Sequence, residues 1–493
     1  MNLDALVSQG EGLNRDLGSE WYQTGAGLKT EPAFQAIYER YAALQSDEAL
    51  TCARDAGIPA LFEWIVDLRV GRRVAPFEER QLQWEQHQGL AVEGRDIPYL
   101  RAAIELQNSP DRTFRIALDR ARARADASGL TPLRRDRFAA ERDVVRGATG
   151  EDDYVAAIAR LSGMDLDALS GQAAALLAET EDMYRDVLAQ LVRRRLGIGL
   201  DALVRADTGW TFRADGYDWA FPGDRLVQTA ARQMSEMGLD ASVDGRVRID
   251  ADEREGKQPR AFCVPVRVPD EVYLVLRPAG GHGDYRTFWH ELGHAMHFAS
   301  VDADRPFHER WLGDNSVTEG FAMLWDHLTM EPGWLARYTE MEQRGGGTAG
   351  QVRDLRFELA VAELYMLRRY AAKLLYEMVL HRTEYGEALG AEYADRLTAA
   401  TLFRYPEEEY VHDVDPGFYA ARYLRAWQLR AAIAHTLVER MDEDWYRNAR
   451  AGAFVQDLMR RGQADPADQL AQEMTGAPLS FAPIVTWLRA VLT

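Results

Sequence analysis

Cysteine and long apolar runs are both scarce in this chain of 493 residues. The two cysteines, Cys52 and Cys263, are too few for a disulfide framework or for a cysteine-based metal site. No uninterrupted apolar run approaches the ~18 residues that a membrane-spanning helix needs. The first residues also lack the basic and apolar regions of a signal peptide. The sequence therefore predicts a soluble, cytoplasmic protein without disulfide bonds.

Positive charge is scarce as well, and lysine occurs only at Lys29, Lys257 and Lys373. The 58 Lys and Arg residues face 78 Asp and Glu residues, which gives a formal net charge of −20. Such a balance disfavours nucleic acid as a partner, because phosphate contacts need a basic surface. It also disfavours binding to an anionic membrane surface. The composition says nothing about the oligomeric state.

Apolar residues make up 47% of the chain, enough for a large folded core. Between residues 31 and 200 they recur every three or four positions, which is the pattern of amphipathic helices, and the pattern returns from residue 285 to the end. We expect a mainly helical fold with an N-terminal helical lobe, residues 1–204, and a C-terminal lobe, residues 205–493, intertwined in one body.

The segment between residues 205 and 285 has a different pattern. Alternating and continuous apolar stretches in it predict short strands, two of which form a hairpin. Pro265 and Pro269 cannot donate ladder hydrogen bonds, so they indicate an edge strand or a bulge. The predicted elements are a helix ending near residue 237 and strands at residues 246–250, 260–268 and 271–276.

The segment of residues 288–297 contains the pattern His-Glu-x-x-His, formed by His290, Glu291 and His294. Residues four apart lie on one face of a helix, so both imidazoles can bind a single zinc ion. Glu291 lies beside them, where a carboxylate can accept a proton from a metal-bound water. With the ten histidines of this chain, the pattern is expected by chance only about 0.02 times. The motif therefore predicts a catalytic zinc site.

Catalytic zinc takes a third protein ligand and keeps one position open. Glu319 follows His294 by 25 residues on a predicted helix, and it is the expected third ligand. Asp326 lies seven residues further, two turns along the same helix face, where it would orient one of the histidines. His297 and His327 are expected to be packed in the interior or to support the ligands.

Together these residues resemble the thimet oligopeptidase and oligoendopeptidase F family of zinc metallopeptidases. The resemblance rests on the two-histidine motif, the gap to Glu319, the position of Asp326 and a tyrosine-containing segment near the C-terminus. It covers about residues 245–430. It implies a helical ellipsoid split by a deep substrate channel, with a small β-sheet beside one zinc ion per chain, and it implies short peptides as substrates.

In that family, His and Tyr residues near the C-terminus bind the scissile carbonyl and stabilise the oxyanion. The resemblance transfers these roles to His412 and to Tyr419 or Tyr423, which are four residues apart and so share a helix face. The family's usual Gly-Tyr-Asp is replaced by Gly417-Phe418-Tyr419, which leaves the assignment between the tyrosines open. The alternatives are a core aromatic stripe and a surface histidine.

Five further residues are candidates for substrate binding. An arginine facing the channel, Arg422 or Arg425, could bind the C-terminal carboxylate of a peptide through two parallel hydrogen bonds. The alternative for this pair is a solvated helix face. The loop of Gly280, Gly281 and His282 could touch the substrate or could be a simple turn.

The predicted chemistry is metal-assisted peptide hydrolysis, in which Glu291 takes a proton from the zinc-bound water and passes it to the leaving amine. The substrate backbone is expected to add as a strand beside residues 264–268 or 272–276. A metallocarboxypeptidase or a dipeptidyl carboxypeptidase would share every zinc residue. A non-catalytic helical binding protein with a relic metal site is the third alternative, and the intact Glu291 argues against it.

Overall fold

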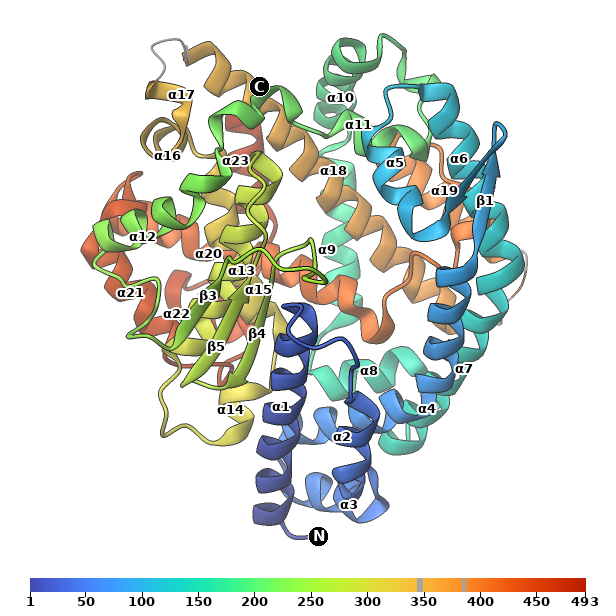
Figure 1. The fold of residues 1–493 in the computed structure, drawn as a ribbon, viewed down its shortest axis with the longest axis vertical. Helices are drawn as coiled ribbons and strands as arrows, with labels where there is room; N and C mark the ends of the chain where they lie inside the picture. The colour runs from blue at the N-terminus through green and yellow to red at the C-terminus, as the bar shows by residue number, and fades with distance from the viewer. Residues whose placement is uncertain (344–348, 384–385, 387) are drawn as a thin grey trace. The chain divides into compact units, whose positions relative to one another are not determined.

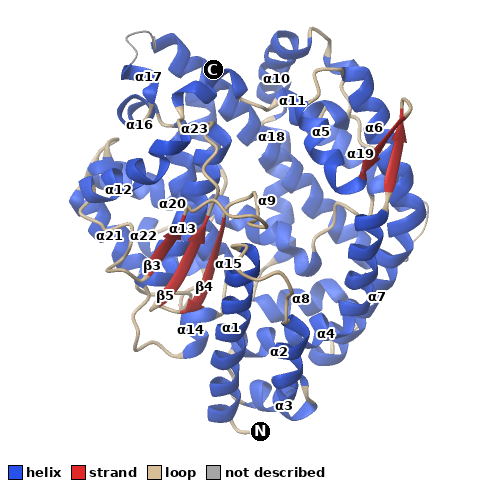
Figure 2. Ribbon diagram, in the orientation of Figure 1, coloured by secondary structure: helices blue, strands red, loops and turns tan. Residues whose placement is uncertain are grey.

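The computed structural model describes residues 1–343, 349–383, 386 and 388–493. Helices dominate this part of the chain and strands are short, as the colours of Figure 2 show. The prediction of a mainly helical fold with a small sheet is confirmed. Both cysteines are free. Among the described residues, no helix combines the length and the apolar character that crossing a membrane requires.

Contacts within the chain divide it into two compact units, each built from three segments. The first unit comprises residues 1–65, 214–356 and 425–484, and the second comprises residues 66–213, 357–424 and 485–493. The predicted boundary between residues 204 and 205 is based on a change in the pattern of apolar residues, and it stays a prediction. The helices that contain residues of both units are α4 (Pro59–His87), α18 (Ala349–Arg382), α20 (Tyr419–Met441) and α23 (Ala482–Leu492).

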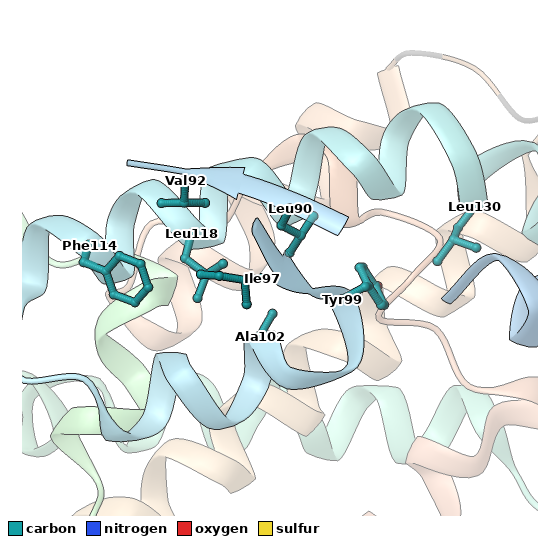
Figure 3. Packing of buried hydrophobic residues seen from close by; sticks show 8 residues of the cluster. All are labelled: Leu90, Val92, Ile97, Tyr99, Ala102, Phe114, Leu118 and Leu130. Atoms are coloured by element: carbon teal, nitrogen blue, oxygen red, sulfur yellow. The ribbon is translucent and has the colours of Figure 1, made fainter. Parts of the chain in front are cut away.

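The second unit holds a β-hairpin that the sequence pattern did not predict. Strand β1 (Gly89–Val92) pairs with β2 (Arg95–Pro98) across a two-residue turn, in which Glu93 and Gly94 both have positive φ. Its apolar side chains pack with those of α5 and α6 in the cluster drawn in Figure 3. The helices of this unit are α5 (Ala102–Asn108), α6 (Arg112–Ala125), α7 (Thr131–Thr149), α8 (Tyr154–Ser162), α9 (Leu166–Glu179), α10 (Glu181–Leu196), α11 (Thr208–Thr211) and α19 (Ala388–Thr401).

The first unit contains the sheet that the sequence predicted, with strand order β3-β5-β4. Strands β4 (Phe262–Arg267) and β5 (Glu271–Val275) form the expected antiparallel hairpin, and β3 (Val247–Asp250) pairs with β5 in parallel. The register of β4 shifts after Pro265, so this strand is both an edge strand and bulged, as the prolines indicated. Because β5 is paired on both sides, a peptide cannot add beside residues 272–276.

Helices cover both faces of this sheet. Helix α13 (His282–Ser300) packs against β4 and β5, and α1 (Leu3–Gly25) packs against β4. The ring of Tyr22 on α1 stacks on Tyr273 of β5, with ring centroids 3.7 Å apart. Figure 1 shows α1, the sheet and α13 beside one another. The other helices of this unit are α2 (Phe34–Arg40), α3 (Asp47–Asp55), α12 (Leu226–Glu236), α14 (Phe307–Trp311), α15 (Asn315–Asp326), α16 (Pro332–Tyr338), α17 (Glu340–Gln343), α21 (Ala449–Met459) and α22 (Ala467–Thr475).

Candidate metal centre

Two helices of the first unit supply the predicted metal ligands. His290 and His294 lie one turn apart on α13, and their ring centroids are 4.9 Å apart. The Nδ1 atom of each histidine lies within hydrogen-bond distance of a side-chain oxygen on α15. His290 Nδ1 lies 3.0 Å from Asp326 Oδ2, and His294 Nδ1 lies 2.9 Å from the hydroxyl oxygen of Thr318. These bonds orient the rings, so that both Nε2 atoms point toward α15 at Glu319.

The buried carboxylate of Glu319 closes the arrangement. Its Oε2 atom lies 3.4 Å from Nε2 of His290 and 3.7 Å from Nε2 of His294. The three donor atoms of His290, His294 and Glu319 lie within 4.8 Å of one another, the only such group of three His, Cys, Asp or Glu residues in the described part of the chain. Two imidazoles and one carboxylate are a common donor set for catalytic zinc.

The close approach of α13 and α15 depends on Gly293, which lies inside the metal motif. A Cβ atom at this position would lie 2.6 Å from the Cα atom of Ala322 and 2.8 Å from Cδ1 of Trp325. Only glycine therefore lets the two backbones lie this close. The short separation explains how ligands 25 residues apart in sequence reach the same point.

The N-terminus of α15 is held by a network of hydrogen bonds and ion pairs. Asp314 accepts the N–H of Ser316 as the N-cap of the helix, and it also accepts the N–H of Ala467. Arg425 donates to Asp314 at 2.9 Å and forms a second ion pair with Asp468 at 2.6 Å. These contacts hold the first turn of the helix that carries Glu319.

Charge balance at this point favours a cation. Burial lowers the pKa of His290, but hydrogen bonds with Asp326 and Glu319 outweigh it and raise the pKa to about 10. Burial lowers the pKa of His294 to about 4, which favours the neutral ring that can bind a metal. Two carboxylates facing one imidazole thus create a demand for positive charge, which a divalent ion meets. On this observation the residues fit zinc.

The predicted base, Glu291, lies between this centre and the sheet. Its Oε2 atom accepts the backbone N–H of Cys263 at 2.8 Å, on the outer edge of β4. Burial raises the pKa of the Glu291 carboxyl, and the positive charge of His290 and the Cys263 N–H only partly oppose this shift. A raised pKa makes this carboxylate a stronger base, which suits it to accept a proton and return it.

The three C-terminal residues that the family resemblance singled out belong to the second unit. Tyr419 and Tyr423 lie on the first two turns of α20, with ring centroids 5.1 Å apart, so they share a helix face as expected. Nε2 of His412 lies 3.1 Å from the hydroxyl of Thr131, and burial lowers the pKa of His412 to about 4. This ring is half-buried against α7. The catalytic roles of all three residues stay predictions.

The predicted substrate loop is a braced turn that leads into α13. Gly280 and Gly281 have φ angles of 90° and 92°, and a Cβ atom on either would contact residues 218–223. Asp284 accepts the N–H groups of Ala279 and Gly280, so it braces this turn. The ring of His282 packs against Phe221 and is 4% exposed. Of the two alternatives for this loop, the geometry favours the simple turn.

Arg422 and Arg425 have different surroundings. Arg422 is half-buried on α20 in the second unit. Arg425 is 8% exposed and, as described above, is ion-paired with Asp314 and Asp468. It is therefore an internal structural residue, neither the solvated arginine nor the carboxylate-binding arginine that the sequence suggested.

Two contacts at the centre were not anticipated from the sequence. Thr318 was available from the pattern, because it directly precedes the expected ligand Glu319 on the same helix turn. The N–H of Cys263 carries no signal of residue type, since any residue except proline offers the same donor. His297 and His327 are buried, as expected, and His297 Nε2 lies 3.1 Å from the carbonyl oxygen of Gly462.

Comparisons with known proteins found a matching family and similar solved structures. The model of peptidase family M3 matches residues 234–489. Among solved structures, "Crystal structure of putative peptidase from Chlamydophila abortus" is similar, with a TM-score of 0.66 and 12% sequence identity over 99% of this chain and 89% of that chain. At this identity the likeness shows the fold alone. A search of curated proteins found no match.

Proposed function

Because this chain belongs to peptidase family M3, we propose that it is a zinc-dependent peptidase that cuts short peptides at internal bonds. Members of this family are peptidases and are zinc-dependent in general. The observation that carries the proposal is the convergence of three donor atoms within 4.8 Å beside Glu291. His290, His294 and Glu319 would hold one zinc ion per chain.

Each residue of the site has a task that follows from its contacts. Bound zinc would act as a Lewis acid toward water and the peptide carbonyl. Asp326 and Thr318 hold the two imidazoles with Nε2 directed at the metal position. Oε2 of Glu291 accepts a hydrogen bond from the backbone N–H of Cys263. Glu291 therefore accepts the proton of the attacking water at Oε1, and it returns the proton to the leaving amine.

The outer edge of β4 is the proposed docking site of the substrate backbone. Residues 262–265 of this strand are half-exposed, and only β5 pairs with the strand. An extended peptide would add beside them, next to the carboxylate of Glu291. The roles of Tyr419 or Tyr423 as hydrogen-bond donors to the oxyanion, and of His412 at the scissile carbonyl, remain proposals from the family resemblance.

Hydrolysis of a blocked, internally quenched peptide tests this function. The purified chain should cleave the peptide, lose activity with a chelator and recover it with zinc. Glu291→Gln should lower kcat at least about a thousandfold while zinc content stays near one per chain, because the variant keeps the ligands and loses the base. Glu309→Gln, a partly exposed carboxylate on α14, is the matched control and should cleave like the wild type.

Product masses decide the kind of cleavage. Internal cuts in a peptide blocked at both ends support the oligopeptidase. Removal of one or two residues from a free C-terminus, without internal cuts, would support the carboxypeptidase alternatives. Cleavage that survives Glu291→Gln would refute the role of this residue.

A further inference from the structure

One arginine lies unpaired beside the proposed docking edge. Arg260 precedes β4 by two residues and is exposed. Within the described residues its side chain makes no hydrogen bond and no ion pair. Cys263, three residues further along the chain, donates its N–H to Glu291 Oε2 at 2.8 Å. Arg260 therefore lies close in sequence to the strand residue that contacts the base, and its guanidinium is available to a ligand.

Neighbouring arginines show that this state is unusual here. Arg267, at the other end of β4 and also exposed, pairs with Glu271 at 3.1 Å. Arg254, in the loop before the strand, pairs with Asp250. In a chain with a net charge of −20, carboxylates are available to most cations. Arg260 lies unpaired at the place where a substrate would bind.

We propose that Arg260 binds a carboxylate of the peptide substrate next to the cleaved bond, and so gives the enzyme a preference for acidic peptides. This inference rests on the proposed peptidase function. The planar guanidinium can hold a carboxylate through two parallel hydrogen bonds. Its charge also offsets the repulsion that an acidic protein exerts on an acidic peptide. Arg425, one of the two arginines that the sequence suggested, already forms ion pairs with two carboxylates.

The strand geometry sets the position of this carboxylate. Cys263 marks the place where β4 meets Glu291, and Arg260 lies three residues before it. Three extended residues span at most about 10 Å, so the guanidinium reaches the second or third substrate residue from the cut. In the proposed arrangement the peptide pairs antiparallel to β4, so its C-terminal part runs past Arg260. The carboxylate is therefore on the C-terminal side of the cleaved bond.

The first test compares cleavage of matched peptides. Internally quenched peptides carry Glu or Gln at one of the three positions after the cleaved bond, and a further pair ends in a free acid or an amide. The wild type should favour the carboxylate by about fivefold in kcat/KM at low ionic strength, and less in high salt. Arg260→Ala should abolish the preference and Arg260→Glu should reverse it. The matched control Arg267→Ala should leave it unchanged.

The two peptide pairs distinguish the source of the carboxylate. An effect of Arg260 on the Glu and Gln pair supports recognition of an acidic side chain. An effect confined to the acid and amide pair supports recognition of the substrate's C-terminus. A carboxylate preference that Arg260→Ala leaves intact, or no preference in the wild type, overturns the inference, while cleavage that still depends on Glu291 leaves the proposed function standing.

A binding measurement decides the inference without turnover. Fluorescence anisotropy with the Glu291→Gln variant reports the affinity for labelled Glu and Gln peptides. The Glu peptide should bind about fivefold tighter, and adding Arg260→Ala should equalise the two. Equal affinities before that change would refute the role of Arg260, whatever the activity of the wild type. A wild type that cleaves no peptide would refute the proposed function separately.

Discussion

Substitution of Gly293 by alanine would test whether the contact between α13 and α15 creates the metal centre. The added Cβ would lie 2.6 Å from the Ala322 backbone and 2.8 Å from the Trp325 ring, whereas ordinary contacts begin at 3.4 Å. The neighbours are a backbone atom and a buried indole, so neither can turn away. The two helices must therefore separate by about 1 Å.

The expected magnitudes follow from this displacement. Overpacking costs about 1–3 kcal/mol, while alanine gains about 1 kcal/mol over glycine in a helix interior, so the net loss of stability is about 0–2 kcal/mol. Metal geometry is less tolerant, because ligand distances must hold within about 0.2 Å. A shift of about 1 Å in Glu319 relative to the histidines should weaken zinc binding at least about tenfold.

Gly283 provides the matched control on the same helix. A Cβ atom there would meet nothing within 4 Å, so Gly283→Ala should leave zinc affinity unchanged and stabilise the helix by up to about 1 kcal/mol. Competition with a chromogenic chelator measures zinc affinity, and thermal unfolding with and without zinc measures stability. Wild-type zinc affinity in Gly293→Ala would refute the close-packing argument, as would equal zinc affinities in the two variants.

Three further predictions concern the surroundings of the centre. Asp326→Asn should lower zinc affinity about 10- to 100-fold without unfolding the protein, because the carboxylate orients His290. The same chelator titration measures this affinity, and an unchanged value would contradict the orienting role of Asp326. Arg425→Met removes the ion pair of the buried Asp314 carboxylate and should cost about 3 kcal/mol in denaturant unfolding, whereas a loss below about 1 kcal/mol would contradict the ion-pair argument. Burial lowers the pKa of His297 to about 4 from its ordinary 6.5. Between pH 4 and pH 6.5 the histidine is protonated in the unfolded chain but not in the folded protein. The free energy of unfolding should therefore fall by about 1.4 kcal/mol for each unit that the pH drops in this range. His297→Gln should flatten the stability profile by that amount, and an unchanged slope would argue against a neutral buried ring.

Much of the candidate site could be predicted because its signals are local. The spacing of His290 and His294 places both rings on one face of any α-helix, whatever surrounds it. The edge position of β4 followed in the same way from Pro265, which lacks the N–H that a central strand needs. The hairpin β1–β2 was missed because its strands are only four residues long and lie between amphipathic helices, where the helical period dominates the pattern.

Pairing across the fold was beyond sequence reasoning. The sequence pattern of a helix is the same whether its arginine faces solvent or two carboxylates. The ion pairs of Arg425 can therefore be seen only when α20, Asp314 and α22 are placed together. The buried ring of His282 is a similar case, because a Gly-rich segment indicates a turn and does not reveal how deeply the turn lies.

The scarcity of histidine and cysteine, together with the motif at His290, predicted from the sequence alone a two-histidine metal site without thiolate ligands. The periodicity determined that the fold is mainly helical with a small sheet. Only the tertiary structure decided which groups support that site, namely Thr318, the N–H of Cys263 and the helix contact at Gly293. The physical reason is that ligand spacing follows from helix geometry within one element, whereas hydrogen bonds and close packing between elements depend on how separate elements pack together.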